Sequence, residues 1–468
     1  MRKRKIISLL LLLLPVSFLT AGSNAGITAG LDSIIRNELP DGTDISLYVW
    51  DLTADSAIYA YRENVLNRPA STLKVLTAYT AVGSLGADYC FRTTVKADGV
   101  VGSDSVLTGN LYIVGGLDPQ LMEEDLRHLA AGVRECGIKR VKGNVIADIS
   151  IMDSIYWGSG WAWDDTPNSY QPYVSPLMVN GGYVTVYVRP GSRGGAPRVT
   201  VVPQISSQKI RNEARTGVEY LGPVSIRRDW LHNDNTIIVS GNSSKATSAE
   251  LNVFDSSDFT FTLFRDCLDK AGIVYDGYKW GECPASTISL TSVAHSLKSV
   301  LRETLKESIN LNAEAMMLQA ARAENGGKVD FNSAAKYEET YIKRTVKTGK
   351  RPFMIVDGSG LSMYDNIPAS LFVDVLRQIY GNPALFELFY DSLPIAGYDG
   401  TLKGRMGTKP TAGTVHAKTG TVTGACTLTG YARTSDGRDL AFCIMNSGAT
   451  KMAPSRRVQD AICQILCR

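Results

Sequence analysis

The sequence predicts a mixed α/β fold in which one domain is built from both ends of the chain and is interrupted by a large β-rich insertion. At 468 residues, the chain is long for a single domain. Helix-like and strand-like patterns occupy the chain up to residue 88 and return from residue 286, whereas short β-like runs separated by Gly, Pro and Asn fill the middle. We therefore predict one α/β domain from residues 26–88 and 286–468, and an inserted region of two subdomains at residues 89–285.

The N-terminus predicts export from the cytoplasm. Residues 2–5 are basic, residues 6–20 are mostly apolar, and small residues follow. This pattern is typical of a secretory signal peptide, which we place at residues 1–25, with cleavage after Ser23-x-Ala25. The apolar run is shorter than the ~20 residues that a membrane span needs, and a retained anchor is the alternative. We expect a periplasmic protein.

Composition excludes several classes of function. A net charge of +3 with 20% charged residues gives no reason to expect nucleic acid as a partner. The four His show no paired metal spacing, so we predict no metal, and we expect no cofactor. Eight well-spaced Cys in a chain of this length do not indicate a disulfide scaffold. Cys267 and Cys283 could close one loop by a disulfide, whereas Cys463 and Cys467, one helical turn apart, indicate a buried helix face. Disulfides and the oligomeric state stay open.

The first half of the chain contains clear local signals. Residues 45–65 predict two strands around a polar turn, because each strand alternates apolar and polar residues. Pro69, followed by Leu73, Leu76 and Val82 at helical spacing, predicts a mostly buried helix that ends at Gly83 or Gly86. Within the insertion we expect one amphipathic helix, at residues 123–137.

Long helical patterns follow the insertion. We expect helices at residues 296–322, with a break in the middle, at residues 368–380 and from about Ser455 to the end. Apolar runs at residues 353–358, 424–434 and 439–447 predict strands, the last two as a hairpin.

The first candidate for chemistry is Ser71-x-x-Lys74, at the start of the buried helix. Residues three apart share one helix face, and a serine becomes a nucleophile when a neighbouring base takes its proton. Burial can lower the pKa of a lysine far enough for it to act as that base. The spacing alone is weak, because Ser206-x-x-Lys209 matches it in a polar segment without helix-start signals.

The second candidate is Ser308-x-Asn310, at the break between two helical patterns. Such a break would direct both side chains into a cleft. A helix cap is the alternative for Ser308. Ser240-x-Asn242 repeats the spacing in a segment that predicts a turn.

The third candidate is Lys-Thr-Gly, which occurs twice. The copy at residues 347–349 is flanked by basic residues and predicts a solvated loop, whereas the copy at Lys418-Thr419-Gly420 lies among small and β-branched residues that favour a strand. An edge strand can pair with an extended peptide. Lys418 would place positive charge beside an anionic group, and Gly420 would allow a ligand to approach closely.

Taken in order, these three motifs resemble those of the penicillin-binding protein and serine β-lactamase superfamily. The segments "GNLYIVGGLDPQL", "GWAWDD", "YVSPLMVNGG" and "VDGSGLS" are similar to segments of its class C low-molecular-mass members, the S13-like D-alanyl-D-alanine carboxypeptidases and endopeptidases. The resemblance covers nearly the whole mature chain. It implies the transpeptidase-type mixed α/β fold of that superfamily, with a large β-rich insertion.

The resemblance also implies a reaction on peptidoglycan stem peptides or cross-bridges. Ser71 would attack a D-Ala-D-Ala carbonyl while Lys74 takes its proton, and water would hydrolyse the acyl-enzyme. Ser308, aided by Lys418, would relay a proton to the leaving amine, and Asn310 would hold the substrate amide. Penicillins and other β-lactams would acylate Ser71 and block it.

The substrate contacts implied by the resemblance lie along the third motif. Lys418 and Thr419 would receive the terminal carboxylate, and the backbone N–H groups of Ser71 and Thr421 would form the oxyanion hole. Asp165, in "GWAWDD", matches an acidic partner for the amine of the stem-peptide side chain. Met363 stands where relatives often carry an arginine, so the third stem-peptide residue stays open.

Two other functions share these motifs. A β-lactamase would keep the core, but such chains usually lack an insertion of this size, and the sequence shows no clear extra general base. A penicillin sensor or wall-binding protein would keep the fold without turnover, but all three motifs are intact. We therefore expect a serine carboxypeptidase or endopeptidase, without deciding between them.

Overall fold

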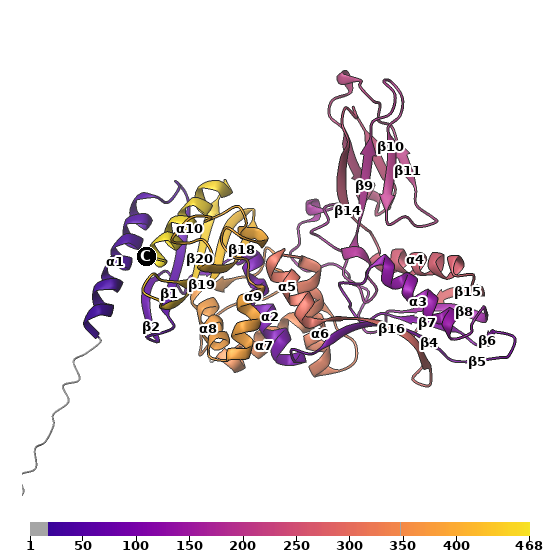
Figure 1. Ribbon diagram of the computed structural model, residues 1–468, viewed down its shortest axis with the longest axis horizontal. Helices are drawn as coiled ribbons and strands as arrows, with labels where there is room; N and C mark the ends of the chain where they lie inside the picture. Colours follow the sequence, from indigo (N-terminus) through magenta and orange to yellow (C-terminus); the bar gives the residue numbers. More distant parts are fainter. Residues whose placement is uncertain (1–16, 347) are drawn as a thin grey trace, which may run out of the picture.

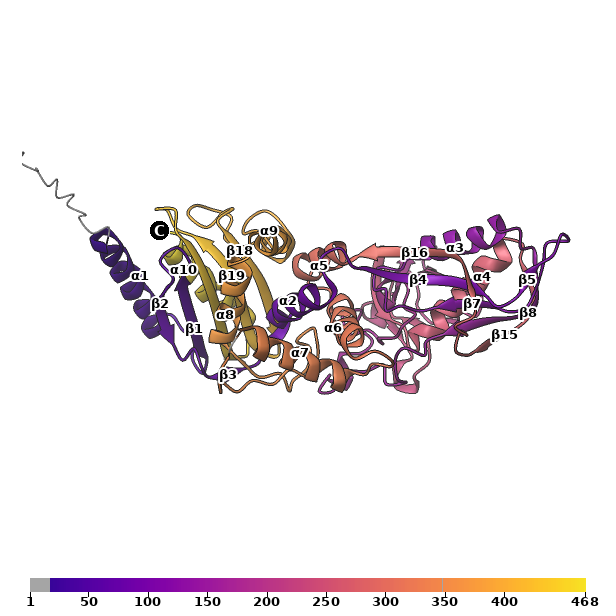
Figure 2. The ribbon, with the colours of Figure 1, turned by 90° about the horizontal axis from the view of Figure 1, so that it is seen from below.

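The computed structural model describes residues 17–346 and 348–468, which form an elongated molecule (Figure 1 and Figure 2). One end holds a five-stranded antiparallel sheet with the order β18-β19-β20-β1-β2. Its strands are β1 (Asp44–Asp51), β2 (Ser56–Tyr61), β18 (Val415–Val422), β19 (Gly424–Arg433) and β20 (Asp439–Ala449). The strands predicted at residues 45–65, 424–434 and 439–447 are confirmed. The sheet therefore joins strands from both ends of the chain.

Helices cover both faces of this sheet (Figure 1). One face carries α1 (Ser17–Asn37) and α10 (Met452–Leu466), and the other carries α2 (Lys74–Leu85), α5 (Leu297–Lys306), α6 (Asn310–Asn325), α7 (Phe331–Val346), α8 (Ala369–Tyr380) and α9 (Pro383–Ser392). Along β20, Phe442 and Ile444 join the core under α1 and α10, while Cys443 and Met445 join the core under α8. The alternation of side chains along a strand thus buries both faces.

The insertion carries its own sheets, and one of their strands, β16 (Ile288–Ser296), lies beyond the predicted boundary at residue 285. A mixed sheet has the order β16-β4-β7-β8-β6-β5, with β15 pairing β8, and α3 (Glu123–Glu135) and α4 (Ser256–Lys270) lie over it (Figure 2). Two three-stranded sheets, β10-β9-β14 and β11-β13-β12, project from it (Figure 1). The strands are β4 (Cys90–Ala97), β5 (Val100–Val101), β6 (Val106–Thr108), β7 (Leu111–Val114), β8 (Arg140–Asp148), β9 (Tyr183–Arg189), β10 (Arg198–Val202), β11 (Ile210–Asn212), β12 (Ser225–Arg228), β13 (Ile237–Ser240), β14 (Thr247–Asn252), β15 (Val274–Trp280) and β16 (Ile288–Ser296).

The sequence missed one helix of the insertion. The expected amphipathic helix is α3, but α4 also forms, capped by the Asp255 side chain, which accepts from Asp258 N. The segment "FTFTLF" within α4 has the composition of a strand. Packing of Phe259, Leu263 and Phe264 into the core of the insertion overrides that preference.

The strand predicted at residues 353–358 is wrong. The segment forms only an isolated bridge, between Met354 and Asn366. Its backbone N–H groups donate instead to side-chain carboxylates, among them Val356 N to Asp365 at 2.7 Å and Gly358 N to Glu314 at 2.8 Å. Carboxylates therefore take the place of a neighbouring strand.

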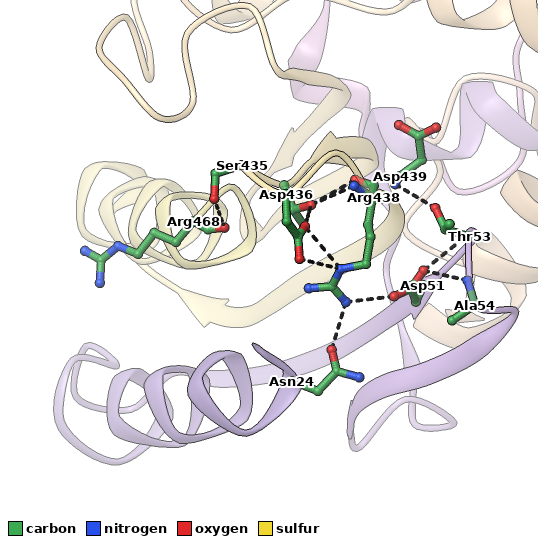
Figure 3. Close-up of polar contacts among 10 residues, drawn as sticks. Asn24, Asp51, Thr53, Ala54, Ser435, Asp436, Arg438, Asp439 and Arg468 are labelled. Atoms are coloured by element: carbon green, nitrogen blue, oxygen red, sulfur yellow. Dashed lines mark hydrogen bonds and ion pairs between the residues drawn. The ribbon is translucent and has the colours of Figure 1, made fainter. Parts of the chain in front are cut away.

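Helix α1 runs across the predicted cleavage site. Arg438, at the turn between β19 and β20, donates to Asp51 at 2.8 Å and to Asn24 of α1 at 2.9 Å (Figure 3). This contact ties α1 to the end of β1. The basic head and most of the apolar run of the predicted signal peptide lie outside the described residues, so the signal peptide stays a prediction.

Two further findings concern the described part of the chain. Within residues 17–346 and 348–468, no helix has both the length and the apolar character that crossing a membrane requires. The eight cysteines, all described, are free thiols in the structure, and Cys463 and Cys467 are buried on α10 and at its end, as expected.

Candidate active site

The serine of the first motif lies in a short 3-10 turn, η1 (Ala70–Leu73), which runs directly into α2. Lys74, the first residue of α2, is fully buried, and its Nζ lies 2.9 Å from Ser71 Oγ. Ala70 has a φ of +47°, a conformation that alanine rarely adopts and that functional sites often retain. The first motif therefore brings a partly exposed hydroxyl and a buried amine into direct contact.

Two fixed acceptors hold the Lys74 amine from the other side. Its Nζ donates to Asn310 Oδ1 at 2.6 Å and to the Ser359 carbonyl at 2.7 Å. Burial lowers the pKa of Lys74 to about 7, against the opposing effect of nearby carboxylates, of which Asp357 is the strongest. At neutral pH a large fraction of this amine is uncharged and able to accept a proton.

The second and third motifs meet at one hydrogen bond. Ser308, with a φ of +64°, lies between the end of α5 and the start of α6, and its Oγ accepts from Lys418 Nζ at 2.8 Å. The helix cap is Ile309, so the alternative role of Ser308 as a cap is wrong. Lys418 is fully buried, and burial, aided by the nearby positive Lys74, lowers its pKa well below the usual value.

Strand β18 lies at the edge of its sheet and presses against the turn that carries Ser71. A Cβ at Gly420 would lie 2.1 Å from Thr427 Oγ1, 2.8 Å from the Pro69 carbonyl and 3.0 Å from Ser71 N. Thr427 Oγ1 also donates to the Pro69 carbonyl at 2.7 Å. Glycine is therefore required at residue 420 for this close approach. Thr419 donates to Thr401 at 2.8 Å, and Thr421 is exposed.

Asp165 reaches this site indirectly. It ends the 3-10 turn η2 (Trp163–Asp165), and its Oδ1 accepts from Tyr170 Oη at 2.8 Å. The Tyr170 carbonyl in turn accepts from Asn310 Nδ2 at 2.6 Å. Burial and the Asp165 carboxylate raise the pKa of Tyr170 to about 12, so this phenol stays protonated. Both ends of the Asn310 amide are thus occupied, by Lys74 and by Tyr170.

Met363 lies beside a cation from another segment. Arg68 Nη1 lies 3.3 Å from Met363 Sδ, and a Cβ at Gly424, the first residue of β19, would lie 2.7 Å from Arg68 Nη2. Met363 N also donates to the Gly160 carbonyl at 3.0 Å, five residues before Asp165. The guanidinium of Arg68, three residues before Ser71, therefore lies beside the Met363 side chain.

A cavity opens beside Ser308 and Asn310. Its volume is about 800 Å³, and it is lined in part by Tyr170, Glu303, Glu307 and Glu250. This volume lies in the range of ordinary ligand sites. The space next to the Ser308–Lys418 bond is large enough for more than a single amino acid.

The repeated spacings lie elsewhere. Ser206 and Lys209 are exposed in a segment without helix, and Asn242 serves a turn, because its Oδ1 accepts from Val218 N at 2.9 Å. Lys347 lies outside the described residues. The rest of that copy lies in a loop, as predicted, with Gly349 exposed but Thr348 buried.

Two carboxylates hold the turn that follows residues 353–356, and the sequence did not point to one of them, Glu314. Glu314 accepts from Gly358 N at 2.8 Å and from Ser359 N at 2.9 Å, and Asp357 accepts from Gly360 N and Ser362 N, each at 2.7 Å. Asp357 lies in the segment "VDGSGLS", which the resemblance had singled out, whereas the only sequence signal for Glu314 was its spacing, one helical turn after Asn310.

Comparison with known proteins agrees with these motifs. Residues 27–468 match the model of a family described as "D-Ala-D-Ala carboxypeptidase 3 (S13) family". A D-alanyl-D-alanine carboxypeptidase of Actinomadura sp. (strain R39) is 30% identical over 452 residues, which cover 92% of this chain and 82% of that protein. D-alanyl-D-alanine carboxypeptidase DacB of Haemophilus influenzae is 25% identical over 424 residues, 88% of this chain and 86% of that protein.

Solved structures show the same fold. Penicillin binding protein 4 (dacB) from Haemophilus influenzae matches with a TM-score of 0.82 at 23% identity, over 93% of this chain and 98% of that one. A second structure of that protein, in complex with a β-lactam, matches with a TM-score of 0.77 at 22% identity, over the same shares of the two chains. The family model spans nearly the whole chain, insertion included, and the chain therefore belongs to the D-Ala-D-Ala carboxypeptidase 3 (S13) family.

Proposed function

We propose that the protein is a serine D-Ala-D-Ala carboxypeptidase of peptidoglycan that works through an acyl-enzyme on Ser71. The observation that carries the proposal is the buried Lys74 amine, with a pKa of about 7, which lies 2.9 Å from the Ser71 hydroxyl. A poorly nucleophilic serine becomes reactive beside such a base. Membership of the S13 family supports the substrate class.

Acylation follows from this arrangement. Ser71 Oγ attacks the carbonyl carbon of the scissile D-Ala-D-Ala bond and gives its proton to Lys74 Nζ. The backbone N–H groups of Ser71 and Thr421 stabilise the oxyanion that forms, because β18 lies directly against the turn of Ser71. The C–N bond then breaks, the departing amine takes a proton, and water later hydrolyses the acyl-enzyme.

Ser308 and Lys418 lie on the side of the site from which the amine would depart. Their 2.8 Å hydrogen bond suits a relay in which Ser308 Oγ protonates the departing amine and recovers a proton from Lys418. Lys418 and Thr419 receive the terminal carboxylate. Asn310 holds the substrate amide when its Nδ2 exchanges the Tyr170 carbonyl for a substrate carbonyl.

Cleavage of cross-bridges is the second activity that we propose. A carboxypeptidase releases one D-Ala, whereas an endopeptidase must accommodate a second stem peptide. The cavity of about 800 Å³ beside Ser308 supports the second case. Incubation with purified cross-linked wall fragments, followed by mass analysis of the products, distinguishes released D-Ala from separated strands.

We further propose that the site selects stem peptides by the third residue and that β-lactams inhibit it by acylating Ser71. Asp165 would receive the amine of that side chain, and the Arg68 guanidinium, whose Nη1 lies 3.3 Å from Met363 Sδ, would take the place of the arginine that relatives often carry at residue 363. The place of action would be the periplasm, after removal of residues 1–25. Residues 89–285 would form the structural unit that borders the part of the cleft where the third stem-peptide residue binds.

Ser71→Ala tests the proposal as a whole. The variant should release no D-Ala from a pentapeptide and should carry no label after incubation with a fluorescent penicillin. Wild-type behaviour in both assays would remove Ser71 from the mechanism. Fast, repeated hydrolysis of a β-lactam by the wild-type protein would favour the β-lactamase alternative, and wall-peptide binding without D-Ala release would favour a sensor.

A further inference from the structure

Four carboxylic acids lie buried behind Lys74. Glu314, Glu338, Asp357 and Asp365 each have no exposed surface. They come from three elements, α6, α7 and the segment that leads from Ile355 to Asp365. A buried carboxyl is costly unless it has hydrogen-bond partners, so the contacts of each one indicate what it does.

Glu314 and Asp357 hold the same turn from two sides. The two oxygens of Glu314 accept from two successive backbone N–H groups, Ser359 N at 2.9 Å and Gly358 N at 2.8 Å. Asp357 holds the next part of the turn through Gly360 N and Ser362 N, both at 2.7 Å. Two donors on one carboxylate favour its charged form and fix its geometry. The backbone of residues 358–362 is thus set by side chains.

This turn presents one carbonyl to the catalytic amine. A neutral Lys74 amine has two hydrogens and one lone pair. The Asn310 Oδ1, at 2.6 Å, and the Ser359 carbonyl, at 2.7 Å, can only accept, so they take the two hydrogens. The lone pair is left for the third neighbour, Ser71 Oγ at 2.9 Å, which can donate its proton. The direction of the Ser359 carbonyl therefore decides where the base points.

We infer that Glu314 is a positioning residue for acylation: it fixes the backbone of Gly358 and Ser359, and the Ser359 carbonyl fixes the Lys74 amine with its lone pair toward Ser71. The inference rests on the proposed function. Helix α6 then controls both acceptors of the Lys74 hydrogens. It carries Asn310, which accepts directly, and Glu314, one turn further along, which holds the backbone of Ser359 in place. Glu314 is buried and touches no substrate.

The charges around this unit act on Glu314 in two opposite directions. Burial, together with the Asp357 carboxylate, raises the pKa of Glu314 to about 8, while its two backbone donors hold it down. The other ionisable groups near Lys74 are Asp357, Asp365 and, across the cleft, Lys418. Burial, together with the Asp357 carboxylate, raises the pKa of Asp365 well above its usual value.

Glu314→Gln tests the inference with little change in volume. The amide nitrogen faces one of the two backbone donors, so one hydrogen bond is lost and the turn shifts. A small misplacement of a catalytic group costs up to about 10²-fold in rate. We expect penicillin acylation and the kcat for D-Ala release to fall about 10- to 100-fold, with KM within about twofold. Glu314→Asp, shorter by one methylene, should fall between this variant and the wild type.

Glu338→Gln is the matched control. Glu338 is as deeply buried as Glu314, but its carboxyl bonds the Thr77 hydroxyl, at 3.0 Å, and burial raises its pKa well above the usual value. Glutamine keeps the size of this side chain and can still bond the Thr77 hydroxyl, which itself donates to the Gly358 carbonyl at 2.8 Å. We expect both rates of this variant to stay within about twofold of the wild type, whatever the change in Tm.

The outcomes separate this inference from the proposed function. If the wild-type protein is not acylated, the proposed function itself is wrong. If the wild type is acylated and a folded Glu314→Gln protein reacts as fast, only the role of Glu314 is wrong. Rate losses in both Gln variants that follow their loss of Tm, or failure of both Glu314 variants to fold, make Glu314 a folding residue and overturn the inference.

Discussion

Lys418 Nζ and Ser308 Oγ, which belong to motifs 110 residues apart, are joined by a hydrogen bond of 2.8 Å. The bond ties the edge strand β18 to the break between α5 and α6, and it faces the pair formed by Ser71 and Lys74. Two buried lysines, each bonded to a serine hydroxyl, therefore line one site.

Lys418→Ala should slow acylation strongly. The variant removes the buried amine that donates to Ser308, and loss of one positioned donor of this kind costs about 10²-fold or more. The measurement is the second-order rate constant for a fluorescent penicillin. Lys347→Ala, in the other Lys-Thr-Gly copy, is the control and should react nearly as the wild type does. If Lys347→Ala slowed acylation and Lys418→Ala did not, the active site would lie at the copy at residues 347–349.

Acylation should depend on pH with an acid limb near pH 7. The base acts only when neutral, and burial lowers the pKa of Lys74 from 10.5 to about 7. Below that value the neutral fraction falls about tenfold for each pH unit, so the rate at pH 5 should be about one-tenth of the rate at pH 6. An ordinary lysine would instead give a rate that still rises up to pH 10. Rates between pH 5 and 10, on protein checked for its fold at each pH, decide between the two.

Gly420→Ala should damage the site more than the fold. The new Cβ would meet the Pro69 carbonyl at 2.8 Å and Ser71 N at 3.0 Å, so β18 must move away from the nucleophile. We expect acylation to fall about 10²-fold and the free energy of unfolding to fall by ~2 kcal/mol. Gly404→Ala, where nothing lies within 4 Å of the new Cβ, is the control. An acylation rate for Gly420→Ala equal to that of the control would show that the close approach is unimportant.

Asp165→Asn should change substrate choice without changing acylation by penicillin. A hydrogen bond between charged groups contributes about 1.5–3 kcal/mol, so kcat/KM for peptides with a free amine on the third residue should fall about 10- to 100-fold. Peptides with that amine acetylated should be affected little. Asp164→Asn, an exposed neighbour in the same turn, is the control. Equal losses for both peptides would mean that Asp165 does not receive the amine.

The three motifs could be predicted because each depends on local patterns. Helical spacing placed Ser71 and Lys74 on one face of a buried helix, and the change of pattern near Ser308 marked the break before α6. The order of the motifs and the resemblance of the remaining segments then identified the family. The strand character of β18 also followed from its composition and the two apolar strands after it, whereas its edge position is a finding of the structure.

The rest depends on contacts between distant residues. Residues 353–358 are apolar enough for a strand, but their N–H groups find carboxylates from α6 and from the same loop. Helix α4 forms from β-favouring residues because its apolar face is buried in the insertion. The link from Glu314 through Ser359 to Lys74 joins three segments that no spacing in the sequence connects.

The turn at residues 355–362 should also be unusual in its exchange with solvent. Amides outside helices and strands usually exchange their hydrogens quickly, because they are hydrogen-bonded only to water. Here the amides of Val356, Gly358, Ser359, Gly360 and Ser362 donate to the buried acids Glu314, Asp357 and Asp365. We expect this irregular loop to keep its deuterium as long as the central strands do, and to release it only when the domain opens as a whole.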